Sequence, residues 1–288
     1  MKNKFIIIFI LILLVANPSL CAVGGYEGLR LWFDVIIPTL LPFMIISNIL
    51  VNSNNVGSNA NNYAAFIGVM CGYPMGAQIS GELYKNNIIS KKAAYISFCM
   101  FNMASPAFIV TYIGKYCLNR LSYVPYIFFA IYAPSVILYL ILRYKYSKHF
   151  IKNEYINKNS QSIFKIIDNA IYAASMTLIK LGGYIIVFSI IACMIKKIPL
   201  ESELLKAIVI AFVEITNGIN FIAQSDLPFM YKYILASAFT SFGGLSCIAQ
   251  TKCILLGCNL SIKKYIYCKL ILASLTALLA FTIYVLLN

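Results

Sequence analysis

The chain has 288 residues, of which 61% are hydrophobic and 11% charged, and its formal net charge is +14. Soluble domains carry about 25% charged and about 45–50% apolar residues, so this composition excludes an ordinary water-soluble fold. It predicts an integral membrane protein built of apolar helices, with the lipid bilayer as its solvent.

The positive charge does not have the arrangement of a nucleic-acid-binding surface. Lys and Arg gather in short polar linkers near residues 85–92 and 143–165, and again at Lys263, Lys264 and Lys269. Nucleic-acid binding needs such residues on one face of a soluble domain, whereas cytoplasmic loops of membrane proteins collect them between apolar segments. We therefore expect no nucleic-acid partner, and we expect all three clusters to be cytoplasmic.

The sequence carries no pattern typical of an enzyme. It lacks GxSxG, HExxH and P-loop motifs, and its nine cysteines form no CxxC pair. We expect neither an enzyme nor a cofactor or metal site.

Apolar segments long enough to cross or enter a bilayer follow one another along the chain. A membrane-spanning helix needs roughly 20 apolar residues. The segments lie at about residues 5–23, 29–51, 63–84, 93–114, 123–142, 168–195, 204–223, 230–256 and 265–287. The predicted fold class is all-α and polytopic, with seven to nine hydrophobic helical segments. Residues 1–25 resemble a signal peptide, and we interpret them as a retained N-terminal transmembrane segment whose cleavage stays open.

The two halves of the chain follow the same order. A basic cytoplasmic linker at 146–167 separates a first repeat, residues 26–145, from a second repeat, residues 168–288. Each repeat has a long apolar segment, a segment interrupted by Gly, a segment interrupted by Ser with Pro or Gly, and a plain apolar helix. If the Gly-interrupted segments re-enter the membrane rather than span it, the basic linkers share one side and the pseudo-symmetric halves are inverted.

Interruptions at corresponding places in the two halves predict a solute site. Gly and Pro free backbone groups that are costly in lipid and are tolerated where protein or a water-filled cavity satisfies them. Matched broken helices point to a transporter site, and helix kinks with close small-residue packing are the alternative. The predicted substrate-binding residues are Gly72, Tyr73, Pro74, Gly76, Asn102, Ser105, Pro106, Lys180, Glu214, Thr216, Asn217, Gly218, Ser241, Phe242, Gly243, Gly244 and Gln250.

Two of these residues are ionisable, and charge inside a membrane is expensive enough to suggest function. Glu214 is a candidate for binding a proton or a cation coupled to transport. Lys180 is a candidate for meeting a substrate carboxylate, pairing with Glu214 or extending to the interface. Helix N-termini after the breaks attract anions, and Tyr73 and Phe242 are candidates for flanking a ring. These residues alone predict a small polar or anionic solute.

The motifs taken together resemble the YlbJ (SpoVV) family of sporulation integral membrane proteins. The motifs that carry the resemblance are residues 28–32, 38–43, 72–77, 102–108, 214–218 and 241–246, with Gln250. The resemblance implies a nucleoside recognition or Gate domain in each half and a role in endospore formation. It also implies passage of dipicolinic acid across the outer forespore membrane.

Partners and alternatives follow from the same resemblance. The implied partners are other sporulation membrane proteins or further copies of the chain. Two other functions stay open: a nucleoside or other small-metabolite permease, and a non-transporting component that gates or scaffolds a spore-maturation complex.

Overall fold

The computed structural model describes residues 11–12, 14–52, 60–150 and 162–287. Within these ranges the chain is helical and contains no β-strand. Among the described residues, four helices are long and apolar enough to cross a membrane, or five if one bent pair is counted as a single span. The four are Leu121–Lys145, Ile163–Lys197, Phe229–Ile254 and Ile262–Leu287. An all-α membrane protein, as predicted, is therefore confirmed.

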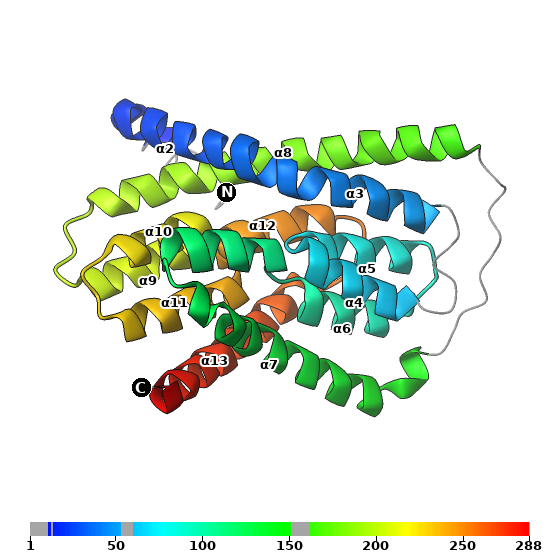
Figure 1. Cartoon of the computed structure of the whole chain (residues 1–288). Helices are drawn as coiled ribbons and strands as arrows, with labels where there is room; N and C mark the ends of the chain where they lie inside the picture. The colour runs from blue at the N-terminus through cyan, green and yellow to red at the C-terminus, as the bar shows by residue number, and fades with distance from the viewer. Residues whose placement is uncertain (1–10, 13, 53–59, 151–161, 288) are drawn as a thin grey trace.

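A long bent helix runs the length of the molecule beside α8 (Ile163–Lys197), as Figure 1 shows. Its consecutive parts are α2 (Pro18–Arg30), the π-helical η1 (Leu31–Ile36) and α3 (Ile37–Asn52). The contact with α8 is close because it uses glycine: a Cβ on Gly24 would lie 2.7 Å from the Cα of Ile190. The sequence analysis expected separate segments at 5–23 and 29–51, whereas α2 continues from the end of the first into the start of the second. The first ten residues lie outside the described chain.

The first Gly-interrupted segment folds as a helical hairpin, which we call the first hairpin. Its arms are α4 (Ala60–Cys71) and α5 (Met75–Lys85), which pack against each other. At the tip, Gly72 has φ of 81°, a left-handed conformation that glycine adopts without steric cost. Arms of this length reach about 17 Å, about half of the hydrocarbon thickness of a bilayer.

The second Gly-interrupted segment, α9 (Glu203–Val213) with α10 (Ile215–Gln224), also forms a hairpin, the second hairpin. α9 and α10 are in close contact at Ala211 and Gly218, and a Cβ on Gly218 would overlap the Cα of Ala211. The backbone N–H of Asp226 donates to the Glu203 carboxylate at 3.2 Å, so the outer ends of the hairpin also meet. Figure 1 shows the two hairpins at opposite ends of the molecule, with their tips directed toward its middle.

Each half continues with a broken helix and then a plain one. In the first half these are α6 (Lys91–Phe101) with the π-helical η3 (Phe108–Cys117), followed by η4 (Leu121–Tyr123), α7 (Val124–Lys145) and η5 (Ser147–Phe150). In the second half they are α11 (Phe229–Phe242), α12 (Gly244–Ile254) and α13 (Ile262–Leu287). The break between α11 and α12 is at Gly243, where φ is 87°.

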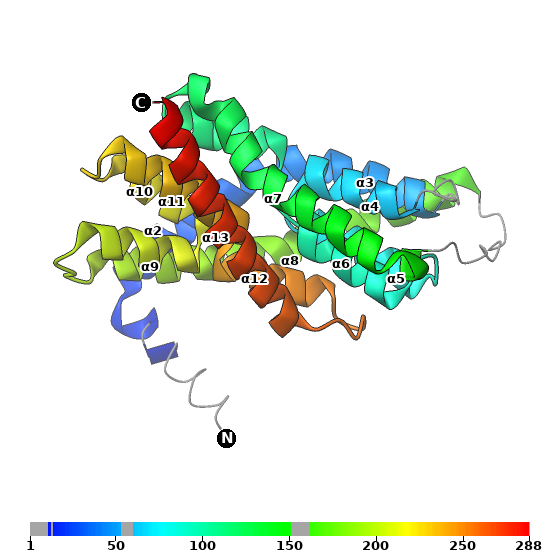
Figure 2. The same cartoon turned by 90° about the horizontal axis from the view of Figure 1, so that it is seen from below.

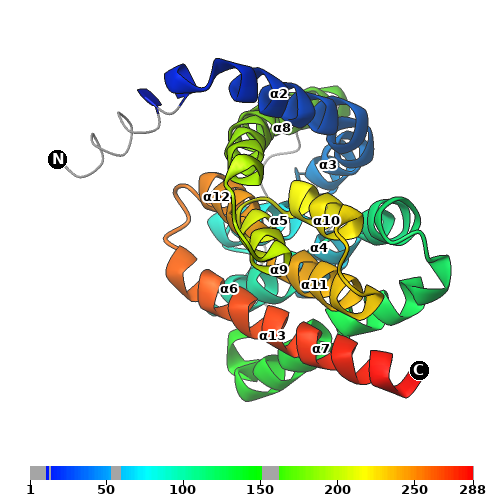
Figure 3. The ribbon, with the colours of Figure 1, turned by 90° about the vertical axis from the view of Figure 1, so that its left-hand side faces the viewer.

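The elements form three layers. α2, α3 and α8 make one outer layer, and α7 crosses α13 in the other (Figures 2 and 3). The hairpins and broken helices lie between these layers, as the end-on view of Figure 3 shows. Irregular backbone is therefore enclosed by long regular helices.

Basic segments from different parts of the chain meet at one end. The Nζ of Lys85 donates to the carbonyl oxygen of Leu256 at 3.2 Å, which joins the end of α5 to the α12–α13 connection. The Nζ of Lys92 lies 3.4 Å from the ring centroid of Tyr146, which joins the start of α6 to the end of α7. Residues 151–161 of the predicted basic linker lie outside the described chain.

Candidate functional site

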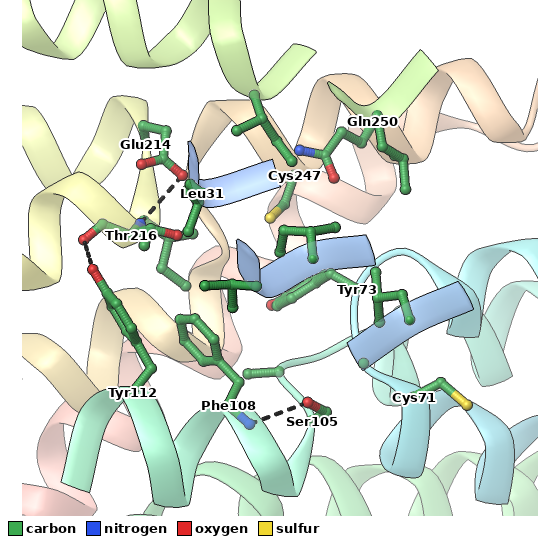
Figure 4. A pocket seen from close by; sticks show the side chains of 18 of the residues that line it. Leu31, Cys71, Tyr73, Ser105, Phe108, Tyr112, Glu214, Thr216, Cys247 and Gln250 are labelled. Atoms are coloured by element: carbon green, nitrogen blue, oxygen red, sulfur yellow. Dashed lines mark hydrogen bonds between the residues drawn. The ribbon is translucent and has the colours of Figure 1, made fainter. Parts of the chain in front are cut away.

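A cavity of about 300 Å³ lies where the tips of both hairpins meet the broken helices (Figure 4). Its walls come from η1, α3, the first hairpin tip, the segment after α6, η3, α8, the second hairpin tip and α12. The volume lies at the lower end of the range for small-molecule pockets. We call this space the central cavity.

Part of the predicted site lines the central cavity. The predicted residues in its wall are Gly72, Tyr73, Ser105, Glu214, Thr216 and Gln250. They come from both halves of the chain, so the breaks bring together residues that are far apart in sequence.

The remaining predicted residues do not line the central cavity. They are Pro74, Gly76, Asn102, Pro106, Lys180, Asn217, Gly218, Ser241, Phe242, Gly243 and Gly244. Phe242, expected to flank a ligand ring, is buried and stacks on Phe212 with ring centroids 5.1 Å apart. Gly76 lets α5 approach the α6 break, since a Cβ there would lie 2.6 Å from the carbonyl oxygen of Phe101. Phe242 and Gly76 therefore serve packing next to the breaks.

Asn102 ties the first break to the second half. Its Nδ2 donates to the Thr251 Oγ1 at 2.9 Å and to the Tyr265 hydroxyl at 2.8 Å. Its Oδ1 accepts a hydrogen bond from the backbone N–H of Ala77 at 3.3 Å. A buried amide with these partners is satisfied, so Asn102 acts as a structural junction between α5, α12 and α13.

Glu214 forms the tip of the second hairpin and is 2% exposed. Its carboxylate accepts hydrogen bonds from the backbone N–H groups of Thr216, at 3.2 Å, and Asn217, at 2.7 Å. It is therefore the N-cap of α10, and it occupies the helix N-terminus that an anion would otherwise use. No ion pair joins Glu214 to Lys180 in the described chain, so the structure does not show the pairing that was one of the roles considered for Lys180.

Tyr73 links the tip of the first hairpin to the α11–α12 break. Its hydroxyl donates to the carbonyl oxygen of Ser241 at 2.8 Å. Its ring lies against Gly243, where a Cβ would be 2.9 Å from the Tyr73 Cζ. The positive φ of Gly243 and its missing side chain both serve this contact.

An aromatic ladder on η3 was missed by the sequence analysis. Phe108, Tyr112 and Tyr116 line the central cavity and stack at 5.0 and 5.7 Å. The Tyr112 hydroxyl donates to the carbonyl oxygen of Thr216 at 2.9 Å, joining η3 to the second hairpin (Figure 4). The spacing of four residues is the signal that predicts one helical face.

The chain is similar to the sporulation integral membrane protein YlbJ of Bacillus subtilis (strain 168), with 22% identity over 316 aligned positions. The alignment covers 92% of this chain and 78% of that protein. This similarity confirms the resemblance seen in the motifs and supports a membrane protein related to sporulation. No protein-family model matches the chain, and no solved structure matches it.

The structure has a second cavity of about 290 Å³, which we call the basic-end cavity. Glu82, Lys85 and Lys180 line it. Leu181 and Gln250 line both cavities, so the two spaces lie back to back. Lys180, a candidate for meeting a substrate carboxylate, thus lies on the other side of this shared wall from Glu214.

Lys269 is a buried lysine that the sequence analysis misplaced. It was expected in a cytoplasmic cluster, but it is 0% exposed, and its Nζ has no hydrogen-bond partner among the described residues. The prediction is wrong because α13 begins at Ile262, so Lys269 lies two turns inside the helix. Its buried face also includes Tyr265, Leu272 and Thr276, a helical spacing that the sequence displays.

Proposed function

We propose that the chain is a sporulation-associated membrane transporter or channel for a small anionic solute. Dipicolinic acid crossing the outer forespore membrane is the favoured case, and that choice rests on the similarity to YlbJ. The proposal depends on one observation: the tips of two hairpins and two broken helices meet around one cavity. Irregular backbone inside a membrane is tolerated where it is buried in protein or lines a water-filled space.

The membrane arrangement we propose has inverted halves. Each hairpin is too short to span and enters from its own end, and the basic segments mark the cytoplasmic end. In this arrangement the two hairpins are the hydrophobic segments that do not span, and the broken unit α6–η3 crosses the bilayer as its counterpart α11–α12 does. Residues 26–145 and 168–288 are the two proposed Gate-like repeats.

The central cavity suits a flat ring with acidic groups, provided that the carboxylate of Glu214 in its wall is neutralised. The face of the Phe108–Tyr112 stack offers an apolar wall for a ring. Glu214 in the same wall repels an anion in this low-dielectric setting unless it binds a proton or a cation. We therefore propose Glu214 as the coupling residue.

Uptake of radiolabelled dipicolinate into liposomes that hold the purified protein tests the proposal. Thr216→Phe fills the central cavity, and Ser274→Phe makes a similar change on the exposed side of α13. Steric overlap that costs about 1–3 kcal/mol corresponds to about a 5- to 150-fold loss of uptake. We expect uptake by the wild type, a loss of at least about fivefold in Thr216→Phe, and no change in Ser274→Phe.

Other outcomes would favour the remaining functions. Nucleoside uptake in place of dipicolinate uptake would identify a nucleoside permease. Absence of any uptake by a correctly folded protein would contradict transport and favour a scaffold in a spore-maturation complex.

A further inference from the structure

Lys269 lies directly behind the wall of the central cavity. Its Nζ is 4.8 Å from the ring centroid of Tyr73 and 5.8 Å from that of Tyr265. Tyr73 also lines the central cavity, so its ring separates the lysine from that space. Figure 4 shows Tyr73 in this wall, between the segments that carry Cys71 and Cys247.

Among the residues that the structure describes, none places a matching negative charge beside Lys269. The ionisable groups that act on it, besides the two tyrosines, are the thiols of Cys99, Cys247 and Cys268. No ion pair includes Lys269 within the described ranges. An unpaired ammonium in a membrane helix costs several kcal/mol, and the cation–π contacts with two rings return only about 1–2 kcal/mol. Packing alone therefore does not account for a lysine here.

The central cavity, in contrast, has an acidic side chain but no basic side chain among the described residues of its wall. Glu214 is the acid in its wall, and neither lysine nor arginine lines it. The amides at the start of α10 are already bonded to Glu214, so they are not free for an anion. A substrate carboxylate in this cavity therefore needs a positive charge from behind the wall.

We propose that Lys269 binds a carboxylate of the transported anion and that Tyr73 moves aside to admit it. This inference rests on the proposed function. The Tyr73 hydroxyl is held at Ser241 by a 2.8 Å hydrogen bond, and the neighbouring wall is the bare backbone of Gly243. Movement of one ring thus connects the unpaired ammonium with the central cavity.

The first experiment measures dissociation constants of dipicolinate, which has two carboxylates, and picolinate, which has one. A charge-assisted contact makes wild type prefer dipicolinate by at least about tenfold. Lys269→Met keeps the volume of the side chain and is expected to abolish that preference. Lys264→Met, at an exposed position on the same helix, is the matched control and is expected to keep it.

The second experiment does not depend on the folding of Lys269→Met. In Tyr73→Ala, a small water-soluble acetylating reagent is expected to modify Lys269, as detected by mass spectrometry, and dipicolinate is expected to protect it. In wild type the modification is expected to be slower, because the ring covers the amine.

The outcomes separate the inference from the proposed function. If wild type binds dipicolinate and Lys269→Met keeps the preference, the Lys269 inference is overturned while transport stands. If Lys269 stays unreactive in Tyr73→Ala, or dipicolinate gives no protection, the inference is likewise overturned. If wild type neither binds nor transports dipicolinate, the proposed function fails and the inference fails with it.

Discussion

The two hairpins have similar shapes, but different chemistry holds their tips. Two contacts that shape the second hairpin are internal to it, because Glu214 caps its own α10 and Gly218 packs on its own Ala211. The Tyr112 hydroxyl also reaches this hairpin from η3. The first depends on its neighbours, because Gly72 fits against the backbone of Ser105 and Tyr73 is anchored to the α11–α12 break. Changes at Glu214 or Gly218 should therefore act first on the second hairpin itself, whereas changes at Gly72 or Tyr73 should act on the contacts between the first hairpin and its neighbours.

The largest expected effect is at the arm contact of the second hairpin. In Gly218→Ala the new Cβ overlaps the Cα of Ala211, and backbone cannot be displaced cheaply. We expect a loss of at least about 3 kcal/mol in the free energy of unfolding. Gly183→Ala is the matched control, because a Cβ at Gly183 would meet nothing within 4 Å. Equal melting temperatures in detergent for the two variants would show that the arms are not packed this closely.

The next effect is at the tip of the first hairpin. Gly72→Ala combines a φ of 81° with a Cβ 2.8 Å from the backbone nitrogen of Ser105. We expect a loss of about 2–3 kcal/mol. Gly257→Ala is the control: its φ is similar, at 83°, but a Cβ there would meet only the flexible end of the Lys85 side chain, at 3.8 Å. It should therefore lose only the part of the unfolding free energy that comes from the strained φ. Chemical unfolding measures the difference, and a zero difference would refute the close approach at Ser105.

Removing the cap of the second tip should have a smaller effect. Glu214→Ala leaves the backbone N–H groups of Thr216 and Asn217 without their acceptor. We expect a loss of about 2 kcal/mol in the free energy of unfolding. Glu201→Ala, at an exposed position before α9, is the control and should be close to neutral. Equal stabilities of the two variants would mean that the carboxylate does not cap α10.

The smallest effect is at the anchor of the first tip. Tyr73→Phe removes the hydroxyl that donates to the carbonyl oxygen of Ser241, and we expect a loss of about 1 kcal/mol. Tyr267→Phe removes a hydroxyl from a side chain that is 69% exposed and should have little effect. Thermal unfolding of both variants checks the comparison, and a larger loss in Tyr267→Phe would contradict it.

The positions of the breaks could be predicted from sequence because Gly and Pro have specific backbone effects. The role of each residue at a break could not. Gly72 lines the cavity while Gly218 and Gly243 serve close contacts between helices, and a glycine in sequence looks the same in both cases. Which side of a break faces the cavity depends on contacts between the two halves.

The misplacement of Lys269 has a different cause. Its neighbours Lys263 and Lys264 lie at the start of α13, so charge clustering alone placed it in the same loop. The four-residue spacing from Tyr265 and the seven-residue spacing to Thr276 put it on the buried helix face. Periodicity was the informative signal there, as it was for the aromatic ladder on η3.

The most direct test asks whether water reaches the space between the hairpin tips. In a background with the native cysteines replaced, Ser105→Cys places a thiol in the central cavity, and Ser135→Cys places one at a position that is 0% exposed and outside it. A small water-soluble methanethiosulfonate should modify Ser105→Cys and leave Ser135→Cys unmodified. An unreactive Ser105→Cys in a folded protein would contradict a water-accessible cavity at the breaks.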